Sequence, residues 1–205
     1  KALKAIDETT FYPSKGKERL KSMIETRPDW CVSRQRVWGV PLPIFINKKT
    51  SEILVDDEVF DNIAKIYEKE GSDCWFSDDP QKFLGKKYKA EDFEKLSDIV
   101  EVWFDSGSTH SFVLEKRKDL KWPASMYLEG SDQHRGWFHS SLLESCGTRD
   151  RAPFESILSH GFVVDGKGLK MSKSLGNVIA PEDILKKYGA DTVSYTHLTL
   201  PTIGC

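Results

Sequence analysis

The spacing of apolar positions divides the chain into stretches of different character. One set recurs at helical spacing ahead of Gly71, a residue suited to a helix end: Val59, Phe60, Ile63, Ile66 and Tyr67. From Ile99 onward, short apolar runs alternate with Gly, Ser and Asp turns, as in 100–104, 125–128 and 156–164. Such runs read as strands buried on both faces, and their alternation with helices predicts an α/β sheet.

Prolines and glycines mark where further elements begin and end. A helix is predicted over 16–26, because Pro28 pushes the residue before it out of the helical region. A last helix is predicted over 182–188, with Pro181 in its first turn and Gly189 at its C-terminal cap. Two prolines within 40–46 exclude a central strand there.

Residues 132–146 complete a predicted strand, turn and helix unit. They follow a strand and a polar turn, and they place four apolar side chains on one helical face, namely Trp137, Phe138, Leu142 and Leu143. Residues 47–97 are instead rich in Lys, Asp and Glu, and we expect a small peripheral insertion there with one amphipathic helix.

The helical pattern of the residues after Pro181 ends abruptly near Thr192. The string from 193 to 202 resembles the in-frame translation of an adaptor used in transposon-based sequencing libraries. We therefore expect 192–205 to be a non-native tail, the alternative being an edge strand with alternating threonines. On this interpretation the native protein continues past this point with a different sequence.

Composition limits the class of protein. With 205 residues, of which 39% are hydrophobic, the chain can bury a core of one domain or one and a half. Thirty basic side chains against 32 acidic ones give a net charge of −2, so contact with a polyanion has to be local. No apolar run approaches the roughly 18 residues that span a bilayer, and no signal peptide is recognisable.

The four cysteines argue against a zinc site or a disulfide framework, because they are far apart and form no CxxC pair: Cys31, Cys74, Cys146 and Cys205. A reducing, cytoplasmic setting is the simplest interpretation. His134 and His139 are five residues apart, but no third ligand stands at a recognised spacing. We therefore predict no protein-bound metal.

The strongest chemical signal is the segment 170–174, which reads Lys-Met-Ser-Lys-Ser after the Gly-rich turn 165–168, and we call 165–174 the lysine loop. Lys170 and Lys173 on a flexible loop can both contact one polyphosphate, and small neighbours allow close approach of the backbone. The simpler alternative is a solvated basic turn. A P-loop is excluded, because the chain contains no GxxxxGK[ST] string.

A second candidate site lies at 127–138, at a strand-to-helix turn, where α/β sheets bind ligands. A carboxylate there can pair with an ammonium group or ribose hydroxyls, and a helix N-terminus favours an anion. These preferences fit an adenylate. The alternative for Glu129 and Asp132 is helix capping.

The Lys-Met-Ser-Lys-Ser segment, followed by an Asn and a Pro-initiated helix, resembles the second signature of class I aminoacyl-tRNA synthetases. The segment 127–138 is similar to the isoleucyl branch of that family. The resemblance implies that the aminoacyl-adenylate is bound by Glu129, Gly130, Asp132 and Gln133. It also implies that Trp137 is a wall of the aliphatic amino-acid pocket.

Two more segments resemble the same branch. Residues 29–39 look like the point where the chain re-enters the catalytic domain after an editing insertion, and 102–108 read Val-Trp-Phe-Asp-Ser-Gly-Ser. Trp103 is then a pocket residue, or else part of the core. His160 and Gly161 end a strand where an adenine or ribose could approach closely, the alternative being an ordinary strand end.

The resemblance covers 1–191 and implies a fold class: α/β, the second half of a Rossmann-like, parallel-sheet catalytic domain with a small α+β insertion. It divides the chain into a re-entry segment (1–46), the insertion (47–97) and a catalytic half with the lysine loop (98–191). The first family signature, His-Ile-Gly-His, is absent, as are editing and anticodon-binding domains. We expect the fragment to be inactive alone.

The implied reaction is ATP-dependent activation of L-isoleucine to isoleucyl-adenylate, followed by transfer to tRNA(Ile). The resemblance implies that ATP binds as its Mg2+ complex and that Lys170 and Lys173 act on its phosphates, with Ser172 beside them. It also implies that the parent protein is a cytoplasmic monomer without membrane contact. Three alternatives stay open. They are a valyl or leucyl enzyme, a nucleotidyltransferase that shares only the fold and the lysine loop, and a noncatalytic tRNA-binding or structural module, which would predict a basic, aromatic face.

Overall fold

The computed structural model describes residues 1–191, and the predicted non-native tail at 192–205 lies outside the described residues. The chain forms two compact units, the first at Lys1–Ser159 and the second from His160 onward. Within the described part no helix has the length and apolar character needed to span a membrane.

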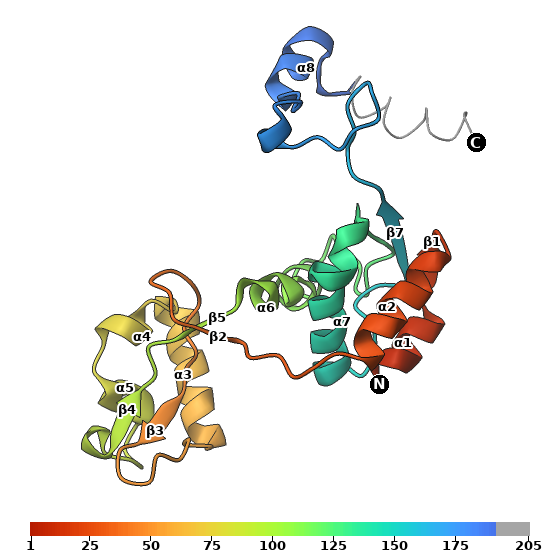
Figure 1. Cartoon of the computed structure of the whole chain (residues 1–205). Helices are drawn as coiled ribbons and strands as arrows, with labels where there is room; N and C mark the ends of the chain where they lie inside the picture. The colour runs from red at the N-terminus through yellow and green to blue at the C-terminus, as the bar shows by residue number, and fades with distance from the viewer. Residues whose placement is uncertain (192–205) are drawn as a thin grey trace. The chain divides into compact units, whose positions relative to one another are not determined.

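The first unit contains most of the elements (Figure 1). In the part that carries the main sheet these are α1 (Ala2–Glu8), β1 (Thr10–Tyr12), α2 (Lys15–Glu25), β2 (Ser33–Arg34), β5 (Ile99–Val100), α6 (Val102–Gly107), the π-helical turn η2 (His110–Leu114), β6 (Tyr127–Gly130), the 3-10 turn η3 (Ser131–Arg135), α7 (Trp137–Thr148) and β7 (Ser156–His160).

The main sheet has three strands in the order β1, β7, β6. Strand β1 runs parallel to β7, with Phe11 opposite Ile157. Apolar side chains from the sheet and from α1, α2 and α7 form one core, in which Leu20, Phe138 and Leu142 are fully buried. The predicted α/β class with a parallel sheet is confirmed.

A second core lies at 45–95, so it begins two residues before the predicted insertion at 47–97. Its elements are β3 (Phe45–Asn47), α3 (Asp57–Glu70), α4 (Cys74–Ser77), α5 (Pro80–Leu84), the 3-10 turn η1 (Ala90–Asp92) and β4 (Phe93–Lys95), and β3 pairs antiparallel with β4. The fully buried Trp75 is at the centre, with its ring 5.1 Å from Phe45 and 5.0 Å from Phe83. This stretch therefore folds around apolar residues of its own.

Predicted helices were found where periodicity and caps agreed. Helix α3 begins where the Asp56 carboxylate accepts two backbone N–H bonds, and it ends at Gly71. Helices α2 and α8 (Pro181–Tyr188) lie within a residue of the predicted ranges. Helix α7 begins later than predicted, at Trp137, because 131–135 form a 3-10 turn.

The strand predicted over 100–104 is wrong beyond Val100. The Glu101 side chain accepts a hydrogen bond from the backbone N–H of Trp103, at 2.8 Å, and so caps the helix α6. Three large apolar side chains at its start, Val102, Trp103 and Phe104, remain 40 to 61% exposed, so the run is not a strand buried on both faces. Strand β7 likewise ends at His160, earlier than the predicted 164.

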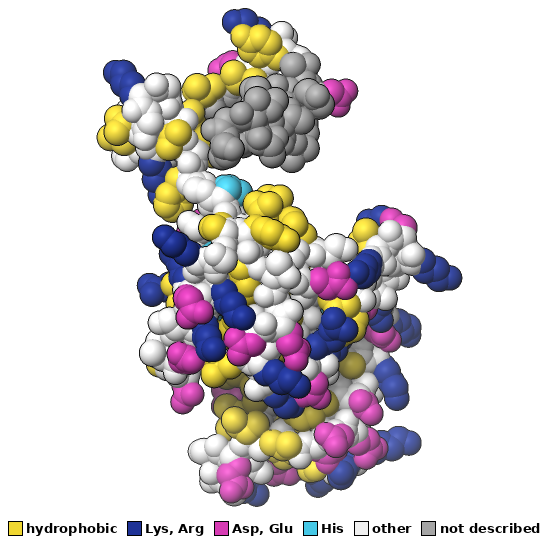
Figure 2. Space-filling view, turned by 90° about the vertical axis from the view of Figure 1, so that its right-hand side faces the viewer, with side chains coloured by type: hydrophobic (Ala, Val, Ile, Leu, Met, Phe, Trp, Pro, Cys, Tyr) yellow, Lys and Arg dark blue, Asp and Glu magenta, His cyan; other side chains and the backbone are white. Residues whose placement is uncertain are grey.

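Charges of both signs are interspersed on the face of the molecule in Figure 2, in keeping with the near-neutral composition. On that face the basic side chains alternate with Asp and Glu. A site for an anion therefore has to be sought in a local arrangement of side chains.

Candidate functional site

The end of β6 and the turn that follows it hold four of the predicted binding residues, Glu129, Gly130, Asp132 and Gln133. The Gln133 side chain links the turn to helix α7, because its carbonyl oxygen accepts a hydrogen bond from the Trp137 backbone N–H at 3.0 Å. Its amide group donates to the Asp132 carboxylate at 3.2 Å. The Glu129 carboxylate accepts from the backbone N–H of Gly130 at 3.1 Å. Polar groups thus gather at the end of the strand, where an α/β sheet binds ligands.

Gly136 is the point where this turn meets Trp103. A Cβ atom at Gly136 would lie 2.5 Å from the Gln133 side-chain oxygen and 3.2 Å from the Trp103 ring. No side chain fits without displacing one of the two. Trp103 is therefore part of this site, and its 42% exposure fits a pocket wall better than the core alternative.

Trp137, the second predicted pocket residue, is half-buried and stacks on Tyr127. The two rings are 4.1 Å apart and nearly parallel, at 10°. The buried Tyr127 hydroxyl lies 3.1 Å from the Ser141 hydroxyl. One strand and one helix thus fix the orientation of the indole, as a rigid pocket wall requires.

His134 fixes the backbone of the same turn. It is 1% exposed, and its Nδ1 lies 2.8 Å from the Ser131 carbonyl oxygen. Its ring packs edge-on against Phe138, and burial lowers its pKa. Among the described residues no group of three or more His, Cys, Asp or Glu side chains is placed to hold a metal.

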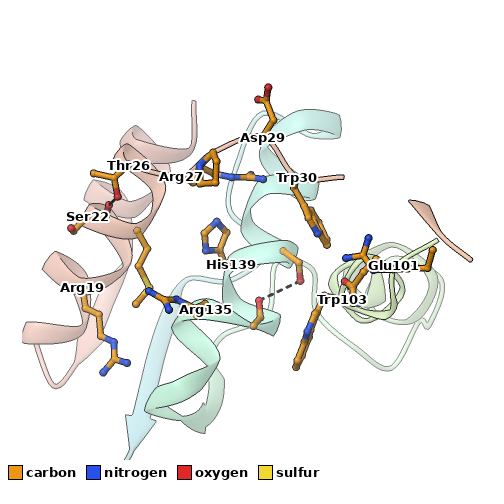
Figure 3. Close-up of a pocket in the computed structure, with 15 residues that line it drawn as sticks. Arg19, Ser22, Thr26, Arg27, Asp29, Trp30, Glu101, Trp103, Arg135 and His139 are labelled. Carbon is orange, nitrogen blue, oxygen red and sulfur yellow. Dashed lines mark hydrogen bonds between the residues drawn. The ribbon is translucent and has the colours of Figure 1, made fainter. Parts of the chain in front are cut away.

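A cavity of about 890 Å³ opens beside this turn in the first unit (Figure 3). Trp103, Gly136, His139 and Ser140 belong to its lining, as does Trp30 from the segment after α2. Four arginines also line it, namely Arg19, Arg27, Arg34 and Arg135. Sequence reasoning missed this group, because its members are far apart in the chain.

Burial and two of these arginines lower the pKa of the His139 imidazole. Burial lowers its pKa first, and the nearby charges of Arg27 and Arg135 lower it further. In the view of Figure 3, Arg27 lies above the His139 ring and Arg135 below it. The ring is therefore neutral near pH 7, and the arginines carry the positive charge of the cavity.

Behind the cavity, helix α6 packs against α7 over a buried carboxyl group. Burial raises the pKa of Glu144 to about 8, and the nearby Asp105 contributes to the shift. One Glu144 oxygen is buried without a hydrogen-bond partner among the described residues. A side chain on Gly107 would overlap this carboxyl group, so the helices are in close contact here.

The lysine loop lies in the second unit and is a closed turn. The Asp165 carboxylate accepts from the backbone N–H groups of Lys167 and Leu169, each at 2.9 Å, and Gly168 has a positive φ of 77°. Val164 and Lys170 form an antiparallel bridge across the turn. The Gly-rich turn 165–168 is therefore the tip of a small hairpin, and the Lys-Met-Ser-Lys-Ser segment starts at the second strand of that hairpin and continues beyond it.

Asn177 braces the loop from the other side. Its amide nitrogen donates to the Asp165 carboxylate at 2.9 Å and to the Lys170 carbonyl at 3.3 Å. Its amide oxygen accepts from the backbone N–H of Ser172 at 2.9 Å. These bonds, the Asn177 bond first, lower the pKa of Asp165. Sequence reasoning noted an Asn here but gave it no role.

The two predicted catalytic lysines differ in surroundings. The Lys170 ammonium lies over the Phe162 ring, 3.6 Å from its centre. Lys173 starts the 3-10 turn η4 (Lys173–Leu175), and within residues 1–191 it forms no ion pair. Lys173 is thus free to bind an anion.

His160 and Gly161 lie at the start of the second unit, and both are exposed. The His160 ring nitrogen Nδ1 is 2.7 Å from the Gly161 carbonyl oxygen. A Cβ atom on Gly161 would meet nothing within 4 Å. Open space of this kind suits the approach of a planar ligand and equally suits an ordinary strand end.

Residues 1–203 match the family described as "tRNA synthetases class I (I, L, M and V)". The chain is 86% identical over 191 residues to the isoleucine--tRNA ligase of Pelagibacter ubique (strain HTCC1062), and 59% identical over 192 residues to that of Brucella abortus biovar 1 (strain 9-941). Each match covers 93% of this chain and 21% or 20% of the relative. The chain spans about a fifth of the length of these curated relatives.

Two solved structures have a similar fold. Methionyl-tRNA synthetase of Mycobacterium tuberculosis, bound by methionyl-adenylate, matches 96% of this chain and 30% of its own, with a TM-score of 0.56 and 18% identity. The leucyl enzyme of Agrobacterium radiobacter K84 in a ternary complex, LeuRS-tRNA-LeuAMS, matches 80% of this chain and 23% of its own, with a TM-score of 0.54 and 24% identity.

Proposed function

This chain belongs to the class I tRNA synthetases, and we propose that the full-length protein carrying it is an isoleucine--tRNA ligase. The reaction is attack of the isoleucine carboxylate on the α-phosphate of ATP, with release of pyrophosphate, followed by transfer of the acyl group to tRNA(Ile). The observation that carries the proposal is the 86% identity to an isoleucine--tRNA ligase across 93% of the chain.

The turn after β6 is the proposed aminoacyl-adenylate site. Glu129 and Asp132 offer carboxylates to the substrate ammonium group and the ribose hydroxyls, and Gln133 orients Asp132 through its bonds to the Asp132 carboxylate and the Trp137 backbone. Because Gly136 has no side chain, Trp103 can lie against the same turn. We propose that Trp103 and Trp137 form the walls that contact the isoleucine side chain, which is apolar and fits between rigid rings.

The lysine loop is the proposed phosphate site. Negative charge moves onto the leaving pyrophosphate as adenylate forms, and a positioned ammonium group lowers the energy of that transition state. Lys173 meets this need because it is exposed and unpaired within residues 1–191, while Lys170 assists from its place over Phe162. Asn177 and Asp165 hold the loop backbone in shape. Ser172, His160 and Gly161 complete the proposed ATP contacts.

Mg2+ fits this scheme as part of the ATP complex. Within residues 1–191 no cluster of His, Cys, Asp or Glu is placed to hold a metal, so the phosphates would supply its ligands. The ion neutralises phosphate charge, and the residues of this chain bind and orient the nucleotide around it.

We propose the same division of the chain into three segments that the family resemblance implies. Residues 1–46 lead back into the catalytic domain from an editing insertion, 47–97 are a peripheral insertion, and 98–191 are the catalytic half. Residues 192–205 are proposed to be non-native, and resequencing the gene across codon 192 tests this. The whole enzyme is proposed to be a cytoplasmic monomer, which light scattering and cell fractionation check.

The deciding experiment is ATP–pyrophosphate exchange by the full-length protein with isoleucine, valine, leucine and methionine in parallel. Exchange fastest with isoleucine supports the proposal. Exchange fastest with valine or leucine would move the protein to a sister enzyme, and no exchange with any of the four would leave a noncatalytic tRNA-binding module.

A further inference from the structure

Helices α6 and α7 lie side by side, and two contacts between them follow a four-residue spacing (Figure 1). The Trp103 ring lies against Gly136, where a Cβ atom would be 3.2 Å from the ring. Four residues further along each segment, Gly107 lies against Ser140, whose hydroxyl oxygen would be 2.9 Å from a Cβ atom on the glycine. Residues four apart share one face of a helix, so a single face of α6 makes both contacts.

Glu144 is the next position on the same face of α7, and its carboxyl group lies where Gly107 brings the two helices closest. A Cβ atom at Gly107 would overlap the carboxyl oxygen Oε1. That oxygen is buried and has no hydrogen-bond partner among the described residues. Burial of this kind costs far more for a charged carboxylate than for an uncharged carboxyl group. The close contact between α6 and α7 therefore depends on whether Glu144 carries a charge.

The groups around Glu144 do not compensate a negative charge. Asp105 faces it from α6, and burial raises the pKa of both carboxyl groups, that of Glu144 to about 8. The titratable side chains of β6 and of the turn η2 are Tyr127 and His110; burial raises the pKa of the first and lowers that of the second, so both are neutral near pH 7. Within residues 1–191 neither Glu144 nor Asp105 forms an ion pair. An ionised Glu144 would therefore repel Asp105 across the helix contact.

The far end of the segment that begins with α6 is fixed to α7 by hydrogen bonds. Arg149, at the end of α7, donates to the Glu115 carboxylate at 2.8 and 2.9 Å and to the Ser111 hydroxyl at 3.1 Å. The near end has only the contact between Trp103 and the backbone of the adenylate turn. Because one end is held and the other is not, a separation of the helices at Glu144 displaces the end that carries Trp103.

We propose that Glu144 is a positioning residue, whose uncharged carboxyl group keeps α6 against α7 and thereby holds the Trp103 ring in place as a wall of the amino-acid site. The inference rests on the proposed function, which assigns Trp103 to the isoleucine side chain. As the pH rises through about 8, Glu144 ionises and α6 moves away from α7. The effect falls on the KM for isoleucine and not on the KM for ATP, whose phosphates are proposed to bind the lysine loop.

The test is ATP–pyrophosphate exchange by the full-length protein at pH 7 and pH 9, with wild type, Glu144→Gln and Glu144→Met. Both variants are uncharged at either pH, and the second replaces the first if that one does not fold. Comparing two proteins at one pH cancels the ionisation of the substrate. The KM for isoleucine in wild type should match that of the variants at pH 7 and exceed it about tenfold at pH 9, roughly the loss of contact with one methylene group. Glu155→Gln is the control, because it removes an exposed carboxylate paired with Lys121, and it should follow wild type at both pH values.

Hydrogen–deuterium exchange of the α6 backbone follows the helix itself. It should be faster in wild type than in Glu144→Gln at pH 9 and equal in the two proteins at pH 7. The proposal is overturned if the KM ratio for isoleucine is the same at both pH values, if the KM for ATP rises with it, or if α6 exchanges equally in both proteins at pH 9. Absence of isoleucine-dependent pyrophosphate exchange in wild type at pH 7 would instead remove the proposed function, and hydrogen exchange would still decide whether Glu144 holds α6.

Discussion

Replacing Glu144 by Gln should stabilise the folded chain at neutral pH. The carboxyl group is buried between α6 and α7, one of its oxygens lacks a partner among the described residues, and burial raises its pKa from 4.5 to about 8. A group whose folded pKa is raised in this way favours the protonated form. In the unfolded chain the same carboxyl group ionises freely near pH 4.5. Glu144 therefore lowers stability progressively as the pH rises from about 4.5 to about 8.

The size of the effect follows from that interval. At pH 7 the distance from the unfolded pKa is about 2.5 pH units, an upper bound of about 3.4 kcal/mol at 1.36 kcal/mol per unit. The side chain is only half-buried, so solvent screening reduces this cost. We expect Glu144→Gln to raise the free energy of unfolding by about 1 to 2 kcal/mol at pH 7 and by less than about 0.5 kcal/mol at pH 5.

Glu115→Gln is the matched control, because its expected effect on the free energy of unfolding has the opposite sign. Its carboxylate accepts two hydrogen bonds from Arg149, at 2.8 and 2.9 Å, and this pair lowers the pKa of Glu115. A lowered pKa gives stability that is present above the unfolded pKa and lost as the pH falls through the folded value. Glu115→Gln should therefore destabilise the chain at pH 7, and the loss should shrink below pH 4.

Urea unfolding followed by tryptophan fluorescence, at pH 5, 7 and 8.5, measures both variants. Infrared titration of the protonated carboxyl band reports the Glu144 ionisation directly. If Glu144→Gln is no more stable than wild type at pH 7, and the pH dependence between 5 and 8 is unchanged, the burial argument is wrong.

Three further predictions concern the sites in the full-length protein. Lys173→Gln should slow adenylate formation by about 100-fold while the KM for isoleucine stays within about twofold, in pyrophosphate exchange; equal losses in both would contradict a transition-state role. Asn177→Ala removes three loop hydrogen bonds and should lower kcat of exchange by about tenfold, with normal thermal stability; an unchanged kcat would show that the brace is dispensable. Gly136→Ala should raise the KM for isoleucine about tenfold by displacing Gln133 or Trp103, whereas Gly147→Ala, where nothing lies within 4 Å, should have no effect.

The sequence predicted best those elements in which local signals agree. Helix α3 was predicted from its apolar period and the terminal Gly71, and in the structure the Asp56 carboxylate caps it as well. The run 100–104 was read as a strand because five residues cannot distinguish a buried strand from a helix by periodicity. The Glu101 cap decided the outcome, and a capping carboxylate cannot be told from an ordinary polar residue before its helix is known.

The candidate sites also differ in how far the sequence alone could predict them. The residues of the adenylate turn and the lysine loop are contiguous in sequence, so short motifs could point to them. The arginine-lined cavity could not be found that way, since Arg27 and Arg135 are 108 positions apart in the chain and only the fold brings them to one cavity. The brace formed by Asn177 and Asp165 was missed for a related reason: its meaning lies in hydrogen bonds to backbone groups, which leave no pattern of residue types.

The Asn177 amide, which holds the lysine loop in shape, is also a group whose chemical breakdown would disrupt that loop. Asparagine is one of the thermolabile residues, since its side chain loses ammonia with time and heat. Conversion of Asn177 to aspartate would replace the donating nitrogen by an oxygen that faces the Asp165 carboxylate across 2.9 Å. The bond to Asp165 would then become a repulsion between like charges, and the bond to the Lys170 carbonyl would be lost. Stored enzyme would lose activity while remaining folded, and a mass increase of about one dalton on the peptide containing Asn177 would mark the molecules affected.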